Sequence, residues 1–65
     1  MKSEEVAFQC WLLVYNFFKE NANKTNVWFE GYNPLLGSSP KHMIEIGREE
    51  KLLKFIKNCL EENAP

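Results

Sequence analysis

The sequence predicts an all-α protein, a small bundle of about four helices, two longer and two short. Three observations support this fold class. Apolar residues recur at helical spacing toward both ends of the chain, and no segment shows the alternation of a strand. Gly, Pro and Ser residues of the kind that begin and end helices divide the middle of the chain. The chain has only 65 residues, so we expect a single domain over residues 1–65 with a thin core.

A first long helix is predicted from Glu4 to Glu20, a segment without Gly or Pro whose first residues are acidic, as suits a helix N-terminus. Its apolar residues fall on two sides, one with Ala7, Trp11, Val14 and Phe18 and the other with Phe8, Leu12 and Tyr15. A helix that is apolar nearly all round is central in its fold or covered by a partner. We therefore expect a homodimer or larger assembly, held mainly by this helix through Trp11, Tyr15 and Phe18.

The polar run 21–25 that follows is predicted to be a loop. Thr25 or Asn26 would cap a short second helix through Glu30. Gly31 would end that helix.

Residues 32–38 hold a Pro, a Gly and two consecutive Leu, which is typical of a turn. We expect this turn to insert Leu35 and Leu36 into the core. Gly37 is predicted to adopt a positive φ there, a conformation that glycine tolerates and β-branched residues do not.

Two more helices are predicted after this turn. Ser39 as N-cap and Pro40 at the first helical position begin a short helix, which Gly47 closes. A long last helix follows from about Arg48 to Glu62. Its inward face is predicted to consist of Leu52, Leu53, Phe55, Ile56, Cys59 and Leu60.

The charge balance and the apolar runs exclude several partners. Eight basic and nine acidic residues leave no cationic surplus to hold a phosphate backbone, so we expect no direct nucleic-acid binding. The apolar run 6–18 is interrupted by Gln9 and Asn16 and is shorter than the ~20 residues that span a bilayer. It follows acidic residues and precedes no cleavage site, so we expect no secretory signal, no membrane contact and a cytoplasmic chain.

Residues that could carry chemistry are few. Cys10, Cys59 and His42 fall short of the four ligands of a zinc site, so no metal or cofactor is expected. The cysteines are interpreted as reduced, packed thiols, with a single disulfide between them as the alternative. The chain has no Asp, and no Ser or Cys is spaced to form a triad with His42. We therefore expect no enzymatic activity.

The second half of the chain carries a more specific series of residues, in the order Trp28-Phe29, Asn33-Pro34-Leu35-Leu36-Gly37, Ser39-Pro40, Met43-Ile44, Gly47-Arg48 and Leu52-Leu53. This series resembles the signature of the toxin-binding domain of Xre/MbcA/ParS-type antitoxins. That signature reads Trp, Asn-Pro-x-Leu-Gly-Gly, Ser/Thr-Pro, a short apolar helix, Gly and a final amphipathic helix. The resemblance covers almost half of the chain. Ser38 stands where the family has its second Gly, and the sequence contains no counterpart of the family's DNA-binding helix-turn-helix.

The resemblance implies a helical module that binds and silences a cognate toxin, in the best-known pairs a RES-domain enzyme that acts on NAD. The family's inhibitory contacts often lie near the end of the chain, which here contains Leu60, Glu61 and Glu62. Acidic side chains suit a cleft that receives phosphates, because they would pair with its Arg and Lys side chains. The signature residues themselves are expected to be mainly structural: Trp28, Asn33, Pro34, Leu36, Gly37, Ser39, Pro40 and Gly47.

Two classes of function therefore remain open. The first is a protein-binding module that inhibits a toxin. The second is a structural or dimerisation module, in which the apolar first helix pairs with its own copy and no toxin is involved.

Overall fold

Four helices and short connections make up the computed structural model, which describes residues 2–62 and the side chains of residues 4–61. The helices are α1 (Lys2–Phe17), α2 (Ala22–Glu30), α3 (Pro40–Glu45) and α4 (Glu49–Glu62). No strand occurs within residues 2–62, where a single antiparallel bridge joins Asn33 and Ser38. The predicted all-α bundle with two longer and two short helices is confirmed.

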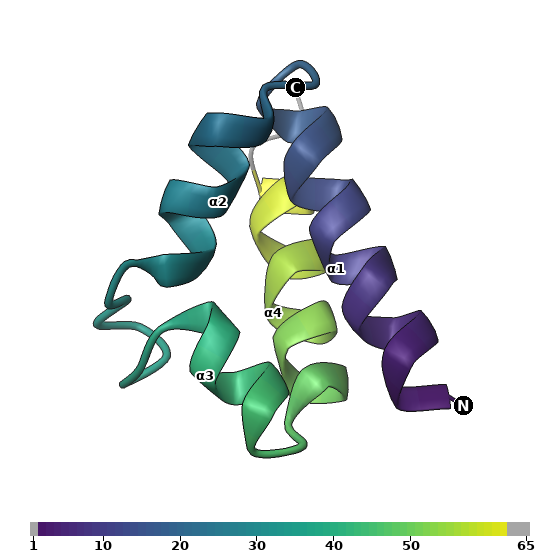
Figure 1. Cartoon of the computed structure of the whole chain (residues 1–65), viewed down its shortest axis with the longest axis vertical. Coiled ribbons are helices and arrows are strands. Elements are labelled where there is room, and N and C mark those ends of the chain that lie inside the picture. Colours follow the sequence, from purple (N-terminus) through teal and green to yellow (C-terminus); the bar gives the residue numbers. More distant parts are fainter. Residues whose placement is uncertain (1, 63–65) are drawn as a thin grey trace.

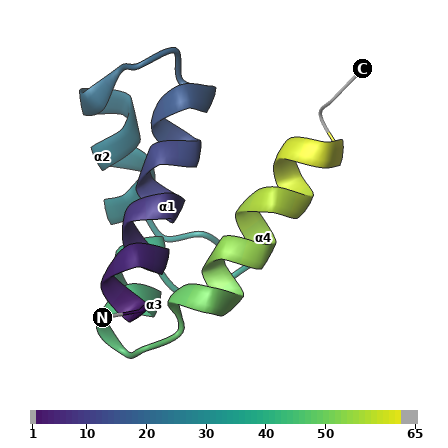
Figure 2. The ribbon, with the colours of Figure 1, turned by 90° about the vertical axis from the view of Figure 1, so that its right-hand side faces the viewer.

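The helices meet around one small core. α1 packs mainly on α4, and α3 contacts both α2 and the beginning of α4 (Figure 1). Figure 2 shows that α4 begins close to α1 and diverges from α1 and α2 toward its own C-terminus. Every helix contributes to the buried core, which contains Cys10, Val14, Phe29, Met43, Leu52 and Ile56. α1 and α4 therefore lie closest together near the start of α4.

The end of α1 differs from the prediction. The helix ends at Phe17, three residues before the predicted Glu20. The N–H groups of Lys19 and Glu20 donate hydrogen bonds to the carbonyls of Asn16 and Tyr15 at 3.0 and 2.8 Å, which is the Schellman pattern. Lys19 and Glu20 accordingly have φ values of 56° and 64°, a conformation that residues other than Gly and Asn rarely adopt. The chain reverses direction here in spite of this unfavourable conformation.

The beginning of α2 also corrects the prediction, because residues 22–25 are helical and not part of a loop. Asn21 is the N-cap, and its side-chain oxygen accepts a hydrogen bond from the Lys24 N–H at 3.0 Å. Thr25 is not a cap: it is fully buried, and its hydroxyl donates to the Asn21 carbonyl at 2.8 Å. This hydrogen bond satisfies the hydroxyl and so permits its burial. Gly31 ends α2 as predicted.

The junction of α3 and α4 follows the prediction closely. The Ser39 hydroxyl accepts a hydrogen bond from the His42 N–H at 3.2 Å, and Pro40 occupies the first helical position. Gly47 has a φ of 80° and completes a second Schellman turn. In that turn the Arg48 N–H donates to the Met43 carbonyl at 2.7 Å. α4 then begins at Glu49, one residue after the predicted start.

Candidate functional site

The turn between α2 and α3 positions one side of the candidate site. The Asn33 carbonyl accepts hydrogen bonds from the N–H groups of Leu36 and Gly37 at 3.0 and 2.9 Å. The Asn33 side-chain oxygen accepts a third hydrogen bond from the Leu35 N–H at 3.0 Å, and the Asn33 backbone N–H donates to the Ser38 carbonyl at 3.1 Å. Gly37 completes this tight turn with a φ of 73°, so the predicted positive φ is confirmed.

The geometry of this turn places one of its two leucines against the core and the other in solvent. Leu36 is half-buried and packs against the core, as predicted. Leu35 is 80% exposed, so its predicted place in the core is wrong. The physical reason is the chain of hydrogen bonds to Asn33, which fixes the backbone of the turn and leaves Leu35 at its outer edge.

Leu35 contributes instead to an apolar groove of about 220 Å³, which we call the α1–α4 groove. The groove lies at the end of the bundle where α4 diverges from α1 (Figure 2). Asn33 is the only amide or charged residue among the described residues that line it. The lining residues are Val14, Phe17, Phe18, Trp28, Asn33, Leu35, Phe55, Ile56, Cys59 and Leu60.

The apolar surface continues beyond this groove onto α2. A shallow hollow beside it shares Phe18 and Trp28 and extends to Val27 and the stem of Lys24. Val27 is 71% exposed, and Phe17 at the groove's other side is 52% exposed. Apolar side chains are therefore in contact with water along this end of the molecule.

The structure brings together two of the predicted contact residues that are far apart in the sequence. Phe18 and Leu60 both line the α1–α4 groove. Glu61 follows Leu60 and is exposed, whereas the side chain of Glu62 lies outside the described residues.

The other two predicted contact residues lie elsewhere on α1. The rings of Trp11 and Tyr15 stack with centroids 4.7 Å apart and an interplanar angle of 20°. The Trp11 indole N–H donates to the Asn26 side-chain oxygen at 3.4 Å. Trp11 lines a different hollow of about 620 Å³, formed by α1, α2 and α3. Trp11 and Phe18 therefore line different hollows.

The signature residues divide between structure and site. Trp28 is half-buried, meets the Phe29 ring edge-on with centroids 5.0 Å apart, and lines the α1–α4 groove together with Asn33. Pro40 is buried, whereas Pro34 is exposed on the turn. Leu36 packs against the core, and the remaining three set the backbone in the ways described above: Gly37, Ser39 and Gly47.

Sequence reasoning missed Phe17, Leu35 and Phe55 as residues of this groove. Phe17 and Leu35 were not distinguished from core residues, because apolar type alone does not separate a core position from an exposed groove position. The one available signal was the excess of apolar residues in the first helix, which exceeds what a single core-facing stripe requires.

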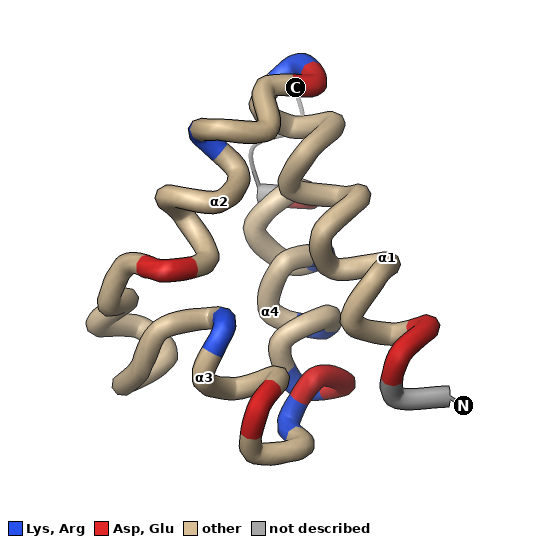
Figure 3. Tube along the Cα trace, in the orientation of Figure 1, with Lys and Arg blue, Asp and Glu red and all other residues tan. Residues whose placement is uncertain are grey.

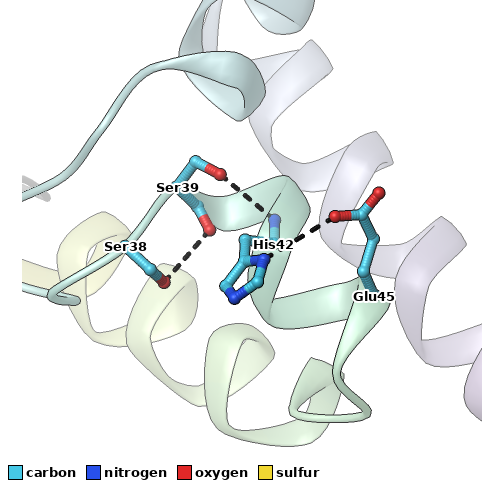
Figure 4. Close-up of polar contacts among 4 residues, drawn as sticks. All are labelled: Ser38, Ser39, His42 and Glu45. Atoms are coloured by element: carbon cyan, nitrogen blue, oxygen red, sulfur yellow. Dashed lines mark hydrogen bonds and ion pairs between the residues drawn. The ribbon is translucent and has the colours of Figure 1, made fainter.

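A Ser–His–Glu cluster at the start of α3 is the arrangement closest to catalytic chemistry (Figure 4). The Ser38 hydroxyl donates to the Ser39 carbonyl at 3.3 Å, and the Ser39 hydroxyl accepts from the His42 backbone N–H. The His42 imidazole lies 3.7 Å from a Glu45 carboxylate oxygen, and both side chains are more than half exposed. Among these residues neither hydroxyl is bonded to the imidazole, and the Ser39 hydroxyl caps the start of α3. No group of three or more His, Cys or Glu side chains in the described part of the chain could hold a metal ion.

The junction of α1 and α4 contains a buried thiol beside a buried carboxylate. The Cys10 thiol donates to the Glu49 carbonyl at 3.7 Å. Burial raises the pKa of this thiol from 9.0 to about 11, and the charge of Glu49 also raises it. Glu49 is only 7% exposed, and one of its carboxylate oxygens has no hydrogen-bond partner among the described residues. Cys10 is thus a packed thiol outside any disulfide, as predicted.

No helix within residues 2–62 is long and apolar enough to cross a membrane. The chain matches no protein-family model, no curated protein and no solved structure.

Proposed function

We propose that this chain is an antitoxin-like module that binds a cognate toxin and obstructs its active site. The observation that carries the proposal is the α1–α4 groove, an exposed apolar surface on a very small protein. Exposed apolar patches of this kind mark protein interaction sites. Phe17 and Leu35, the most exposed residues of its rim, would make the first contacts.

The ends of α1 and α4 support the same proposal. Phe18 and Leu60 were expected to make partner contacts for separate reasons, and they line one groove. Glu61, exposed directly after Leu60, adds a negative charge at the end of α4. An apolar segment of the toxin would occupy the groove while Glu61, with Glu62, pairs with the Arg or Lys side chains of a phosphate-receiving cleft.

Because this chain resembles the toxin-binding domain of Xre/MbcA/ParS-type antitoxins, the toxin would be a RES-type enzyme that acts on NAD. The toxin would carry the chemistry, and this chain would need neither a cofactor nor contact with nucleic acid or a membrane. It would act in the cytoplasm, where such a toxin would consume NAD. The alternative function is a dimerisation module without a toxin, which the exposed apolar side chains of Phe8 and Leu12 on α1 favour.

The test is co-expression of the chain with the toxin encoded by the neighbouring gene, with growth and cellular NAD as readouts. Leu35→Lys and Phe17→Lys each place a charge at the groove rim, at positions exposed enough to leave the fold intact. Phe8→Lys is the matched control, because Phe8 is a 62% exposed aromatic residue on α1 that does not line the groove. Truncation after Cys59 removes Leu60 and the acidic residues but keeps the core residues Leu52 and Ile56.

We expect the wild-type chain and Phe8→Lys to restore growth and NAD, and the groove variants and the truncation to restore less. Equal rescue by Leu35→Lys, Phe17→Lys and the wild type would exclude the groove as the contact surface. If the neighbouring gene is not toxic, or the wild-type chain does not rescue growth, the antitoxin proposal is wrong. The dimerisation module then takes its place.

A further inference from the structure

A continuous cleft runs along α1 and α3 and shares no residue with the α1–α4 groove. Its wide part is the hollow of about 620 Å³ that contains Trp11 and the exposed ring of Phe8. Its narrow part is a hollow of about 220 Å³ at the start of α4. The two parts adjoin, because both are lined by Ala7, Ile44 and Glu45. We call them together the α1–α3 cleft.

The indole of Trp11 is held in place in the wide part of this cleft. The Tyr15 ring stacks on it with centroids 4.7 Å apart. The indole N–H donates to the Asn26 side-chain oxygen on α2 at 3.4 Å. Phe8, one turn before Trp11 on α1, is 62% exposed and lines the same part. The wide part therefore presents a pre-organised apolar surface, to which a partner's apolar side chain binds without first ordering the indole.

Carboxylates gather in the narrow part of the cleft. Glu4 of α1, Glu45 of α3 and Glu49 of α4 line it, and none of the described residues around it is basic. Figure 3 shows these three acidic stretches at the same end of the molecule. Glu30 adds a carboxylate in the wide part, where Lys41 is the one basic residue among the described lining residues. The cleft is therefore negatively charged, although the net charge of the whole chain is only −1.

One of these carboxylates is buried without a partner. Glu49 is only 7% exposed, and one of its carboxylate oxygens has no hydrogen-bond partner among the described residues. A buried charge is costly unless it is paired and hydrogen-bonded, so Glu49 favours a donor that enters the narrow part. The Glu45 side chain is 61% exposed, and the His42 imidazole 3.7 Å away forms an ion pair with it only when protonated. Two carboxylates are thus open to a cation.

We propose that the α1–α3 cleft binds a segment of a partner protein in which an arginine lies beside an apolar residue. The guanidinium enters the narrow part and donates to Glu45 and Glu49, while the apolar side chain packs on Phe8 and Trp11 in the wide part. No group among the described residues could hold a metal ion, whereas the five N–H donors of a guanidinium reach acceptors on different helices. Lysine fits less well, because its compact ammonium cannot bridge separate carboxylates in this way.

The test is an NMR titration of the isotope-labelled full chain with three capped tripeptides. Leu-Arg-Leu is the probe, Leu-citrulline-Leu keeps its shape without the charge, and Ala-Arg-Ala keeps the charge without the large apolar side chains. The chain has two tryptophans, so the indole N–H signal of Trp11 reports on the cleft and that of Trp28 on the α1–α4 groove. Trp11→Phe assigns the two signals, because it removes one of them.

We expect Leu-Arg-Leu to shift the Trp11 signal with a Kd of roughly 1 mM and to leave the Trp28 signal in place. Leu-citrulline-Leu should bind roughly tenfold more weakly, because it cannot form charge-assisted hydrogen bonds through a cationic side chain. Ala-Arg-Ala should also bind at least about fivefold more weakly, because it buries less apolar surface in the wide part.

Substitution of single carboxylates locates the guanidinium. Glu49→Gln should weaken the binding of Leu-Arg-Leu roughly tenfold, because it removes the charge of the buried acceptor. Glu45→Gln should weaken it roughly two- to fivefold, and the exposure of this side chain leaves the fold intact. Glu61→Gln is the matched control: it removes the same charge from an exposed residue outside the cleft and should change the Kd less than about twofold. Circular dichroism verifies the fold of each variant.

An unchanged Trp11 signal up to about 10 mM Leu-Arg-Leu would overturn the proposal. Equal binding of Leu-citrulline-Leu would reduce the cleft to an apolar site, and equal binding of Ala-Arg-Ala would make it a site for a free cation; either result contradicts the proposal. Equal affinities of the wild type, Glu45→Gln and Glu49→Gln would contradict it as well. Because the cleft and the α1–α4 groove share no residue, none of these results decides the toxin proposal, which is tested by rescue of growth.

Discussion

Gly37 holds the turn that carries Asn33 and Leu35, and its replacement by alanine isolates a single energetic effect. Gly37 has a φ of 73°, and a Cβ built on it would meet no heavy atom within 4 Å. Gly37→Ala therefore creates no clash, and its full effect is that of forcing an L-residue into the left-handed region. This conformation costs about 1–2 kcal/mol per residue. Gly37→Val should cost more, because β-branched residues tolerate a positive φ poorly.

The expected loss in the free energy of unfolding is large for so small a protein. A change of 1 kcal/mol shifts Tm by roughly 4–8 °C in a domain of this size. Urea denaturation and thermal unfolding, both followed by circular dichroism, measure the effect. Gly47→Ala should behave like Gly37→Ala, because Gly47 has a φ of 80° and equally open surroundings.

Gly31→Ala is the matched control. Gly31 has a φ of −80°, which alanine adopts without strain, although the added Cβ would lie 3.3 Å from the Val27 carbonyl. We expect a change of no more than about 0.5 kcal/mol. Chemical synthesis allows a still sharper comparison, since D-alanine prefers the positive φ that L-alanine avoids. Gly37→D-Ala should be at least as stable as the wild type, and equal stabilities of the L- and D-alanine variants would refute the reasoning.

The remaining predictions concern α1. Lys19→Gly should relieve the strain of the positive φ of 56° and stabilise the chain by about 0.5–1 kcal/mol at low micromolar concentration. Lys54→Gly, inside α4, should instead destabilise the chain by about 1 kcal/mol. Thermal unfolding measures both effects. Because burial raises the Cys10 pKa from 9.0 to about 11, the unfolded chain releases this proton at a lower pH than the folded chain. The free energy of unfolding, measured in urea, should therefore fall as the pH rises from about 9 to 11, and the fall should be smaller in Cys10→Ala.

The features that the sequence predicted correctly are those in which a few adjacent residues determine the backbone. Ser39 and Pro40 begin α3 because one supplies a side-chain acceptor and the other has a φ already suited to a helix. Gly37 and Gly47 adopt positive φ values because they carry no Cβ. Local chemistry suffices in each of these cases, and no contact with a distant residue is needed.

The features that were predicted wrongly depend on choices between local signals or on tertiary packing. Asn21 and Thr25 are both residues of the type that caps helices, and the sequence did not show that Asn21 would cap while Thr25 is buried. Lys19 and Glu20 give no sequence signal for a positive φ, because their types disfavour it. Leu35 is apolar and yet faces solvent, because hydrogen bonds to Asn33 determine the path of the turn.

The α1–α4 groove could be predicted only in part. Phe18 and Leu60 were expected to make partner contacts, but their proximity depends on how α1 packs on α4. The groove exists because α4 diverges from α1, and an interhelical angle results from the packing of side chains across the whole interface. The periodicity of a single helix does not contain this information.

The apolar residues all round α1 are explained by three different surroundings. Cys10 and Val14 face the core, Phe17 and Phe18 reach the α1–α4 groove, and Phe8 lines the hollow between α1, α2 and α3. A chain of 65 residues with nine aromatic side chains buries too little surface to cover them all, so some of this apolar area stays exposed. Because the groove and this hollow share no residue, substitutions that line one should leave the other unchanged, and their effects on the free energy of unfolding should add.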